Sequence, residues 1–278
     1  MNSTFREKIT PALNYILCHF TWLVRLYMNA SFRLTRPDRR LAELKDSHLG
    51  EKCFIVGLGP SLTLNDLDTL FAQRVYTFSM NRCYQLFAKT KWRPNSYLVS
   101  DAKACTPEAK RAMTEMLDGG TSVFYSRQEI KHLDSRAIWF KVDFDDFVLR
   151  NSRKEKYRSQ SHFCRMSTDA FKGIYPGSTS VHSIIQIAYY MGFREIYLIG
   201  TDCGLSKGRN YSDALPQNAN SAYAIGEGDL MIKDYDSMAR DISEKHLDLR
   251  IFNATRGGHL EVFPRVDFDC VFPSADEK

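Results

Sequence analysis

The sequence lacks the cysteine and charge patterns that mark several common classes of protein. Its seven cysteines are scattered along 278 residues, and no two of them form a C-x-x-C pair. An odd number of dispersed cysteines argues against a disulfide framework or a zinc site and fits a reducing compartment. The 38 basic and 33 acidic residues give a net charge of only +5. We therefore expect no metal site, no nucleic-acid partner and a cytoplasmic location.

The sequence also lacks a long uninterrupted hydrophobic run, and we expect no cleavable signal peptide. The apolar run from Ala12 to Met28 is broken by His19 and Arg25, so it is too short and too polar for a confident membrane-spanning helix. It is rich in aromatic residues, and arginines follow it. We therefore expect residues 1–48 to form an amphipathic, basic segment on an anionic membrane, at the inner face of the cytoplasmic membrane. Packing against the domain or against a second subunit of a homo-oligomer is the alternative.

Short apolar segments alternate with helical segments over residues 49–278, which predicts one α/β domain. Such alternation is typical of a Rossmann-like fold, an open and mostly parallel sheet with helices on both faces. Residues 143–172 show no clear period and are expected to form an irregular insertion or lid. Strands are expected at 53–56, 75–79, 97–100, 121–126, 136–142, 195–200 and 249–255, and helices at 62–71, 107–117, 181–191 and 230–246.

Glycines and polar residues follow several of these strands. Ligands of open parallel sheets bind outside the carboxyl ends of the strands, so we expect these residues to meet at one edge of the sheet. The five strand ends are Gly57–Ser61, Asn81, Asp101, Gly200–Asp202 and Asn253–Gly258.

The first of these ends is the glycine-rich turn Gly57–Ser61. It lacks the third glycine of the G-x-G-x-x-G pattern. Its two glycines would let the backbone approach a ligand closely, and the N-terminus of the following helix can favour a phosphate. A tight turn between strand and helix, without a ligand, is the alternative.

Five stretches of the sequence carry a resemblance to known proteins. FIVGLGPSL, SMNRCY, YLVSD, GSTSVHSIIQIAYYMGFREIYLIGTD and IFNATRGGHLEVFPRVDF together resemble the 6-hydroxymethylpterin diphosphokinase-like family. That family includes flagellin-modifying and cell-surface polysaccharide proteins. The same order of segments is similar to the bacterial CMP-sialic-acid-dependent sialyltransferases of glycosyltransferase family forty-two. The resemblance covers about residues 50–265.

The resemblance implies a glycosyltransferase that moves a CMP-linked acidic sugar to a cell-surface glycan or a lipid-linked acceptor, without a cofactor. Two alternatives remain open. One is pyrophosphoryl transfer from ATP to a pterin-like alcohol, for which Mg²⁺ and the carboxylates of Asp101 and Asp202 would be needed. The other is a non-catalytic binding protein on the same fold.

The resemblance also implies which residues bind the donor. The family turn reads G-N-G-P-S-L, and Leu58 replaces its asparagine here. Asn81 matches the family asparagine that follows the second strand. Thr179 and Ser180 match a Thr-Ser pair at the start of a buried helix, where hydroxyls and free N–H groups suit a carboxylate, a phosphate or a ribose. The expected donor-binding residues are Gly57, Gly59, Pro60, Ser61, Asn81, Asp101, Thr179, Ser180, Gly200 and Thr201.

The catalytic residues follow the family pattern less closely. Tyr211 lies near the spacing of a family tyrosine that hydrogen-bonds the departing phosphate, whereas a second such tyrosine would fall near Gly204. The family base is a histidine before the last helix, but residues 203–245 contain none. The expected catalytic set is His259 as the base, Tyr211 at the leaving group and Asp202 holding its loop, with Asp101, Asp213, Glu227 and Asp229 as alternative bases.

Overall fold

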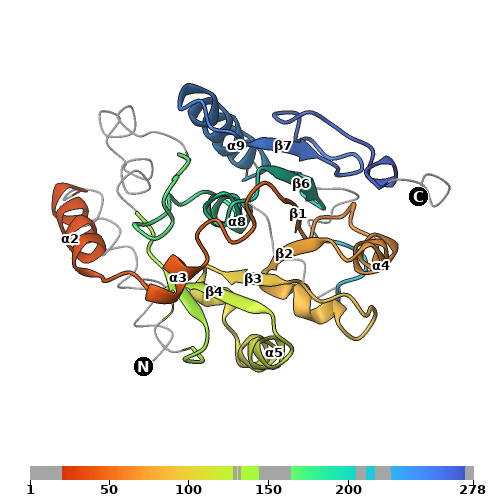
Figure 1. Ribbon diagram of the computed structural model, residues 1–278, viewed down its shortest axis with the longest axis horizontal. Helices are drawn as coiled ribbons and strands as arrows, with labels where there is room; N and C mark the ends of the chain where they lie inside the picture. The colour runs from red at the N-terminus through yellow and green to blue at the C-terminus, as the bar shows by residue number, and fades with distance from the viewer. Residues whose placement is uncertain are drawn as a thin grey trace, which may run out of the picture.

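The computed structural model describes residues 21–127, 130, 133–143, 164–204, 211–216 and 227–272. Its centre is a seven-stranded sheet in the order β5-β4-β3-β2-β1-β6-β7 (Figure 1). Every neighbouring pair of strands is parallel, so the expected α/β, Rossmann-like fold is confirmed. The strands are β1 (Lys52–Val56), β2 (Tyr76–Met80), β3 (Ser96–Val99), β4 (Ser122–Ser126), β5 (Ile138–Phe140), β6 (Glu195–Ile199) and β7 (Arg250–Asn253).

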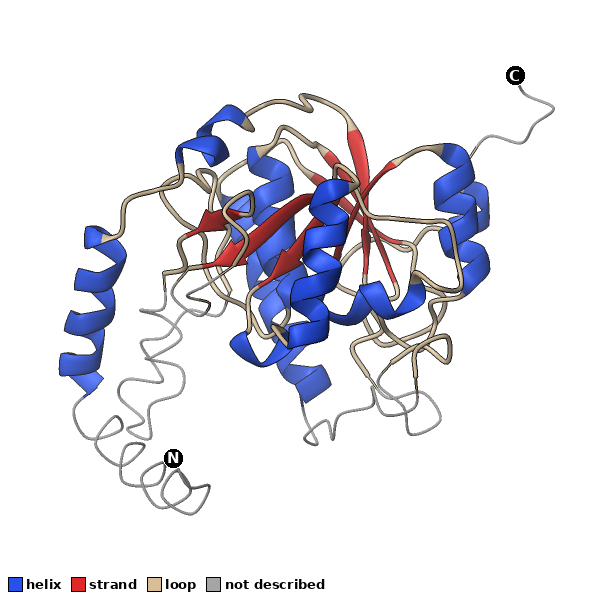
Figure 2. Cartoon of the chain, turned by 90° about the horizontal axis from the view of Figure 1, so that it is seen from below, coloured by secondary structure: helices blue, strands red, loops and turns tan. Residues whose placement is uncertain are grey.

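Helices cover both faces of this sheet. Figure 2 shows them in the view turned by 90°, packed against the strands on either side. The described α-helices are α2 (Thr21–Leu34), α3 (Arg39–Glu43), α4 (Leu64–Gln73), α5 (Pro107–Asp118), α8 (Ser180–Tyr190) and α9 (Glu227–Glu244). The short 3₁₀ helices are η1 (Asn81–Leu86), η2 (Ala102–Ala104) and η4 (Phe268–Cys270).

The core consists of two hydrophobic clusters, one on each face of the sheet. In β1, Cys53 and Ile55 join the cluster formed with α3, α8 and α9. Phe54 and Val56, which alternate with them, join the cluster formed with α4 and α5. All four side chains are completely buried. The continuous apolar run in the sequence is therefore a central strand that is covered on both faces, as parallel sheets require.

The order of the strands reverses next to β1. The chain adds β2 to β5 on one side of β1, then crosses through α8 to place β6 on its other side. This arrangement creates a crevice outside the carboxyl ends of β1 and β6, where open α/β sheets bind their ligands.

Helix α4 begins two residues later than the sequence pattern predicts. The side chain of Thr63 accepts a hydrogen bond from the Asp66 N–H at 3.2 Å, and the Asp66 carboxylate accepts one from the Thr63 N–H at 2.9 Å. This reciprocal pair, a capping box, satisfies two of the free N–H groups at the helix start. Leu62 precedes the helix and is buried in the core instead.

The chain before β1 is attached to the domain through α3. Leu41 is 1% exposed and belongs to the core, and the buried Asp38 accepts a hydrogen bond from the Trp139 N–H at 3.2 Å. The domain boundary at residue 48 stays a prediction. No helix in the described ranges is long and apolar enough to cross a membrane. Of the expected insertion at 143–172, residues 144–163 lie outside the described residues, and residues 164–172 contain turns and bends only.

Candidate functional site

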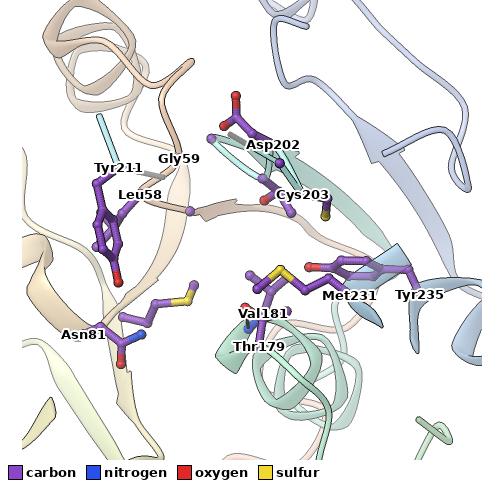
Figure 3. Close-up of a pocket in the computed structure, with 15 residues that line it drawn as sticks. Leu58, Gly59, Asn81, Thr179, Val181, Asp202, Cys203, Tyr211, Met231 and Tyr235 are labelled. Atoms are coloured by element: carbon purple, nitrogen blue, oxygen red, sulfur yellow. Dashed lines mark hydrogen bonds between the residues drawn. The ribbon is translucent and has the colours of Figure 1, made fainter. Parts of the chain in front are cut away.

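A small pocket of about 110 Å³ lies at the crevice where β1 and β6 end (Figure 3). Backbone from the turn after β1 and from residues 200–204 forms one side of it. The other sides are side chains from η1, the start of α8, α9 and the segment around Tyr211. The lining includes the apolar side chains Leu58, Met80, Val181 and Met231 and the polar residues Asn81, Thr179, Thr201, Asp202, Tyr211 and Tyr235.

The glycines of the first turn let two loops cross. The Gly57 N–H donates a hydrogen bond to the Ile199 carbonyl oxygen, and the Gly59 N–H donates one to the Gly200 carbonyl oxygen, each at 2.8 Å. A Cβ atom at Gly57 would overlap the carbonyl group of Gly200, and one at Gly59 would overlap the carboxylate of Asp202. Gly200 itself adopts φ +61°, which glycine tolerates best. The glycines are therefore required by contact between the two loops, whatever else the turn binds.

The side chain of Asp202 binds Ser61, which lies shortly before the N-terminus of α4. Its Oδ1 accepts a hydrogen bond from the Ser61 N–H at 3.1 Å and its Oδ2 accepts one from the Ser61 hydroxyl at 2.9 Å. The side chain is 6% exposed, and this burial raises its pKa, while the hydrogen bonds from Ser61 lower the pKa in part. The position that we expected for a phosphate is therefore taken by a carboxylate of the protein itself.

The N-terminus of α8 is a second place where an anion can bind. Thr179 caps this helix, and its side chain accepts a hydrogen bond of 3.4 Å from the Val181 N–H. The preceding Ser178 is fixed by the buried carboxylate of Asp234 in α9, which accepts from its N–H at 2.8 Å and from its hydroxyl at 2.6 Å. The N-terminal end of the α8 dipole favours negative charge, and the Asp234 carboxylate of the protein already lies beside it.

Asn81 has two features that are typical of a functional residue. It adopts φ +51°, a conformation that costs energy in residues other than glycine. Its Oδ1 atom is buried and has no hydrogen-bond partner within the described part of the chain. The backbone is fixed by the Tyr97 hydroxyl, which donates to the Asn81 carbonyl oxygen at 2.7 Å. The amide thus retains hydrogen-bonding capacity at the pocket wall.

Tyr211 is positioned by the residue that follows it. The Ser212 N–H donates to the Leu58 carbonyl oxygen at 2.9 Å, and the Ser212 hydroxyl donates to the Leu62 carbonyl oxygen at 2.6 Å. These bonds attach the segment to the glycine turn. The ring of Tyr211 then lines the pocket, and its hydroxyl points toward Asn81 (Figure 3).

A second and larger pocket of about 620 Å³ continues from the first. The two share Asn81, Thr179, Tyr211 and Met231. The larger pocket lies over the ends of β2 to β5, and its volume is in the range of small-molecule sites. It is rich in hydroxyl and charged groups: Arg82, Ser100, Asp101, Lys103, Ser126, Ser178, Ser180 and Ser183.

Sequence reasoning missed several residues of this larger pocket. Ser126 is the last residue of β4, is completely buried, and its hydroxyl has no partner among the described residues. Ser100 follows β3, and its hydroxyl lies 3.0 Å from that of Ser180. Both serines stand at carboxyl ends of expected strands, and this position was the signal that could have identified them.

His259 lies apart from Tyr211. It is exposed and lines a third pocket of about 220 Å³. The backbone N–H of His259 donates a hydrogen bond to the Asp202 carbonyl oxygen at 2.8 Å. That pocket also contains Pro60 and Ser61 and meets the first pocket at Asp202 and Gly204. The roles of these residues stay predictions.

The structure therefore distributes the expected site residues over three adjoining pockets. Gly57, Gly59, Asn81, Thr179, Gly200, Thr201, Asp202 and Tyr211 line the first; Asn81, Asp101, Thr179, Ser180 and Tyr211 line the second; Pro60, Ser61, Asp202 and His259 line the third. Among the alternative bases, Asp213 and Asp229 are exposed and line none of these three pockets, and the side chain of Glu227 lies outside the described residues.

Comparison with models of known protein families assigns the chain to one of them. The model of the family described as 6-hydroxymethylpterin diphosphokinase MptE-like matches residues 25–208. The chain belongs to the MptE-like family. No curated protein matches the chain.

Two solved structures are similar to the MptE-like chain. The MAf glycosyltransferase from Magnetospirillum magneticum AMB-1 aligns with 86% of this chain and 36% of its own, with a TM-score of 0.50 and 16% identity. The sialyltransferase CstII from Campylobacter jejuni, solved with the substrate analogue cytidine-5'-monophosphate, aligns with 78% of this chain and 85% of its own, with a TM-score of 0.43 and 15% identity. The chain spans about a third of the length of the MAf structure, and its likeness to that structure shows the fold alone.

The family description directs attention to the carboxylates that a diphosphokinase would need for Mg²⁺. In the MptE-like chain Asp101 is exposed, accepts a hydrogen bond from the Lys103 N–H at 2.8 Å and lines the second pocket. Asp202 lines the first and third pockets. Within the described ranges, no three His, Cys, Asp or Glu side chains are grouped closely enough to hold a metal ion.

Proposed function

We propose that this MptE-like chain is a glycosyltransferase that transfers an acidic sugar from a CMP-linked donor to a glycan or lipid-linked acceptor of the cell envelope. The observation that carries the proposal is the junction of the first and second pockets. Asn81, Thr179 and Tyr211 line both of them. A donor that extends through both pockets would have its phosphate at this junction, next to the N-terminus of α8.

The two pockets differ in chemistry in the way that the two ends of a sugar nucleotide differ. The first is small and combines the side chains of Leu58, Met231 and Tyr235 with polar groups, which suits a flat heterocyclic base that also forms hydrogen bonds. The second is larger and rich in hydroxyl groups, which suits a sugar and its acceptor. Its basic residues, Arg82 and Lys103, favour a sugar that carries a carboxylate. The choice of CMP among the nucleotides rests on the resemblance of the sequence to CMP-dependent enzymes.

The reaction would be displacement at the anomeric carbon of the donor. An acceptor hydroxyl loses its proton to a base, its oxygen bonds to the anomeric carbon, and CMP leaves with the electrons of the broken bond. The Tyr211 hydroxyl and the N–H groups at the start of α8 would donate hydrogen bonds to the departing phosphate. The base would be His259, as the sequence predicts, or Asp101. Asp101 lines the pocket proposed for the acceptor, whereas His259 lines the third pocket.

A pterin diphosphokinase is the second candidate, and the description of the family favours it. Phosphoryl transfer of this kind needs Mg²⁺ held by carboxylates. Asp101 and Asp202 line different pockets, so a Mg²⁺ ion would be held by one of them together with the phosphates of ATP.

Thermal unfolding with a panel of nucleotides tests the proposal. CMP or CTP should stabilise the protein equally with Mg²⁺ or with EDTA, by about 2.7 kcal/mol at one hundred times the Kd. Asn81→Gly removes the amide but tolerates φ +51°, and should abolish this shift. Arg74→Gly is the matched control, since Arg74 has φ +52° at the end of α4 and lines none of the three pockets.

The other outcomes of the panel decide against the proposal. Stabilisation by ATP only when Mg²⁺ is present would support the diphosphokinase. No response to any nucleotide would support a non-catalytic binding protein on this fold.

A further inference from the structure

Helix α2 presents large apolar side chains to solvent. Leu26, Tyr27 and Leu34 are 62%, 71% and 82% exposed. Only six large apolar side chains are exposed in the described part of the chain, and half of them lie on this one helix of 14 residues. Single exposed apolar residues are ordinary on protein surfaces, but a group on one short element indicates an interaction surface. Figures 1 and 2 both show α2 projecting from the side of the sheet domain.

The exposed residues form one side of the helix. Leu26, Ala30 and Leu34 follow each other at intervals of four residues, and all three are exposed. Phe32 faces the domain, since its ring lies against Gly173 and the Lys141 ammonium is 4.3 Å from its centre. The helix is thus attached through one face and leaves an apolar face, defined by Leu26, Tyr27 and Leu34, without a partner in the described chain.

The exposed charged residues between positions 26 and 40 are all positive. Arg33, Arg36 and Arg39 are exposed. The one acidic residue between residues 26 and 40 is Asp38, which is 7% exposed and is bound by Arg40 at 2.7 Å. An apolar face with arginines beside it matches the boundary between the acyl chains and the anionic headgroups of a membrane.

We propose that α2 lies flat on an anionic lipid surface, the inner face of the cytoplasmic membrane. The apolar face would enter the boundary between headgroups and acyl chains, and the three arginines would contact lipid phosphates. At 1.5 Å per residue, 14 residues reach only about 21 Å, less than the ~30 Å hydrocarbon core, so the helix lies on the bilayer and does not cross it.

A second copy of the chain fits this surface less well than a membrane does. A two-fold symmetric contact places the same patch on both sides of the interface. The arginines of each copy would then lie near those of the other, without an exposed carboxylate of residues 26–40 to offset them. Anionic lipids supply the opposite charge.

Vesicle cosedimentation of the full chain tests this assignment. The protein should bind vesicles of phosphatidylcholine mixed with phosphatidylglycerol and not those of phosphatidylcholine alone, and added salt should weaken the binding. Leu26→Ser and Leu34→Ser should each lower partitioning about tenfold or more. Arg33→Gln and Arg36→Gln should each lower it about fivefold on the mixed vesicles only.

Matched controls lie elsewhere on the surface. Leu49→Ser removes a leucine that is 68% exposed outside α2, and Arg240→Gln removes an exposed arginine of α9; both should bind the vesicles as the wild type does. Equal binding to both vesicle types, or unchanged binding of the Leu26→Ser/Leu34→Ser double variant, would overturn the proposal. It would also be overturned if the wild type binds no vesicles and is a dimer that the double variant converts to a monomer. This test uses no nucleotide, so its result is independent of the proposed transferase activity.

Discussion

Replacing Gly59 with alanine tests whether the glycine turn exists for contact between loops or for contact with a ligand. The Gly59 N–H donates to the Gly200 carbonyl oxygen at 2.8 Å. A Cβ atom at residue 59 would lie 2.7 Å from that same oxygen and would overlap the Asp202 carboxylate. Atoms of the protein therefore have to move before alanine fits, even when no ligand is present.

The expected loss of stability follows from these contacts. Forcing an extra carbon into a closely packed site typically costs about 1–3 kcal/mol. If Asp202 moves away, its two hydrogen bonds from Ser61 weaken, and bonds of this kind contribute ~1 kcal/mol or more each. We expect Gly59→Ala to lower the free energy of unfolding by at least about 2 kcal/mol, or the Tm by roughly 4–8 °C.

Urea and thermal unfolding of the ligand-free protein, followed by circular dichroism, measure this loss. Gly119→Ala is the matched control, because Gly119 has φ −81° and a Cβ there would meet atoms no closer than 3.4 Å. This control should be neutral or slightly stabilising, by up to about 1 kcal/mol. If Gly59→Ala unfolds like Gly119→Ala but no longer binds nucleotide, the turn serves the ligand and our reasoning about the crossing loops is wrong.

Three further predictions concern residues around the pockets. Burial raises the pKa of the Asp202 carboxyl, so the stability that this carboxyl contributes is present at low pH and is lost as the pH rises through the folded-state pKa. Urea unfolding at a series of acidic pH values should show that Asp202→Asn removes this loss. If the free energy of unfolding changes with pH equally in both proteins, the prediction is wrong. Tyr211→Phe should lower kcat by ~10²–10³-fold with little change in donor KM, measured as release of CMP, and an unchanged kcat would remove Tyr211 from the leaving-group role. His259→Ala should slow turnover ~10²–10⁴-fold at neutral pH if it is the base, and full activity would transfer that role to Asp101.

Much of the fold could be predicted from the sequence because its signals are local. The apolar runs at 53–56 and 195–200 predicted strands of a parallel sheet, and they form the adjacent β1 and β6. The start of α4 was misplaced because Thr63 and Asp66 form a capping box with aspartate at its third position, where glutamate is the usual sequence signal.

The site could be predicted only in part, because its main interactions join distant parts of the chain. Strand ends and the resemblance together identified Asn81, Thr179 and Tyr211, and the structure brings all three into one pocket. The bond between Ser61 and Asp202 connects residues 141 positions apart, and no local pattern indicates it. The sequence therefore suggested a phosphate where the folded chain places its own carboxylate.

The central claim is that the phosphate of a CMP-linked donor binds at the junction of the first and second pockets. A crystal structure of the full chain with CMP tests it most directly. Our account predicts that the phosphate lies within hydrogen-bond distance of the Thr179 and Tyr211 hydroxyl groups, with the cytosine base in the first pocket and Asp202 still bound to Ser61. A phosphate bound to the Ser61 N–H at the start of α4, with Asp202 displaced, would contradict it.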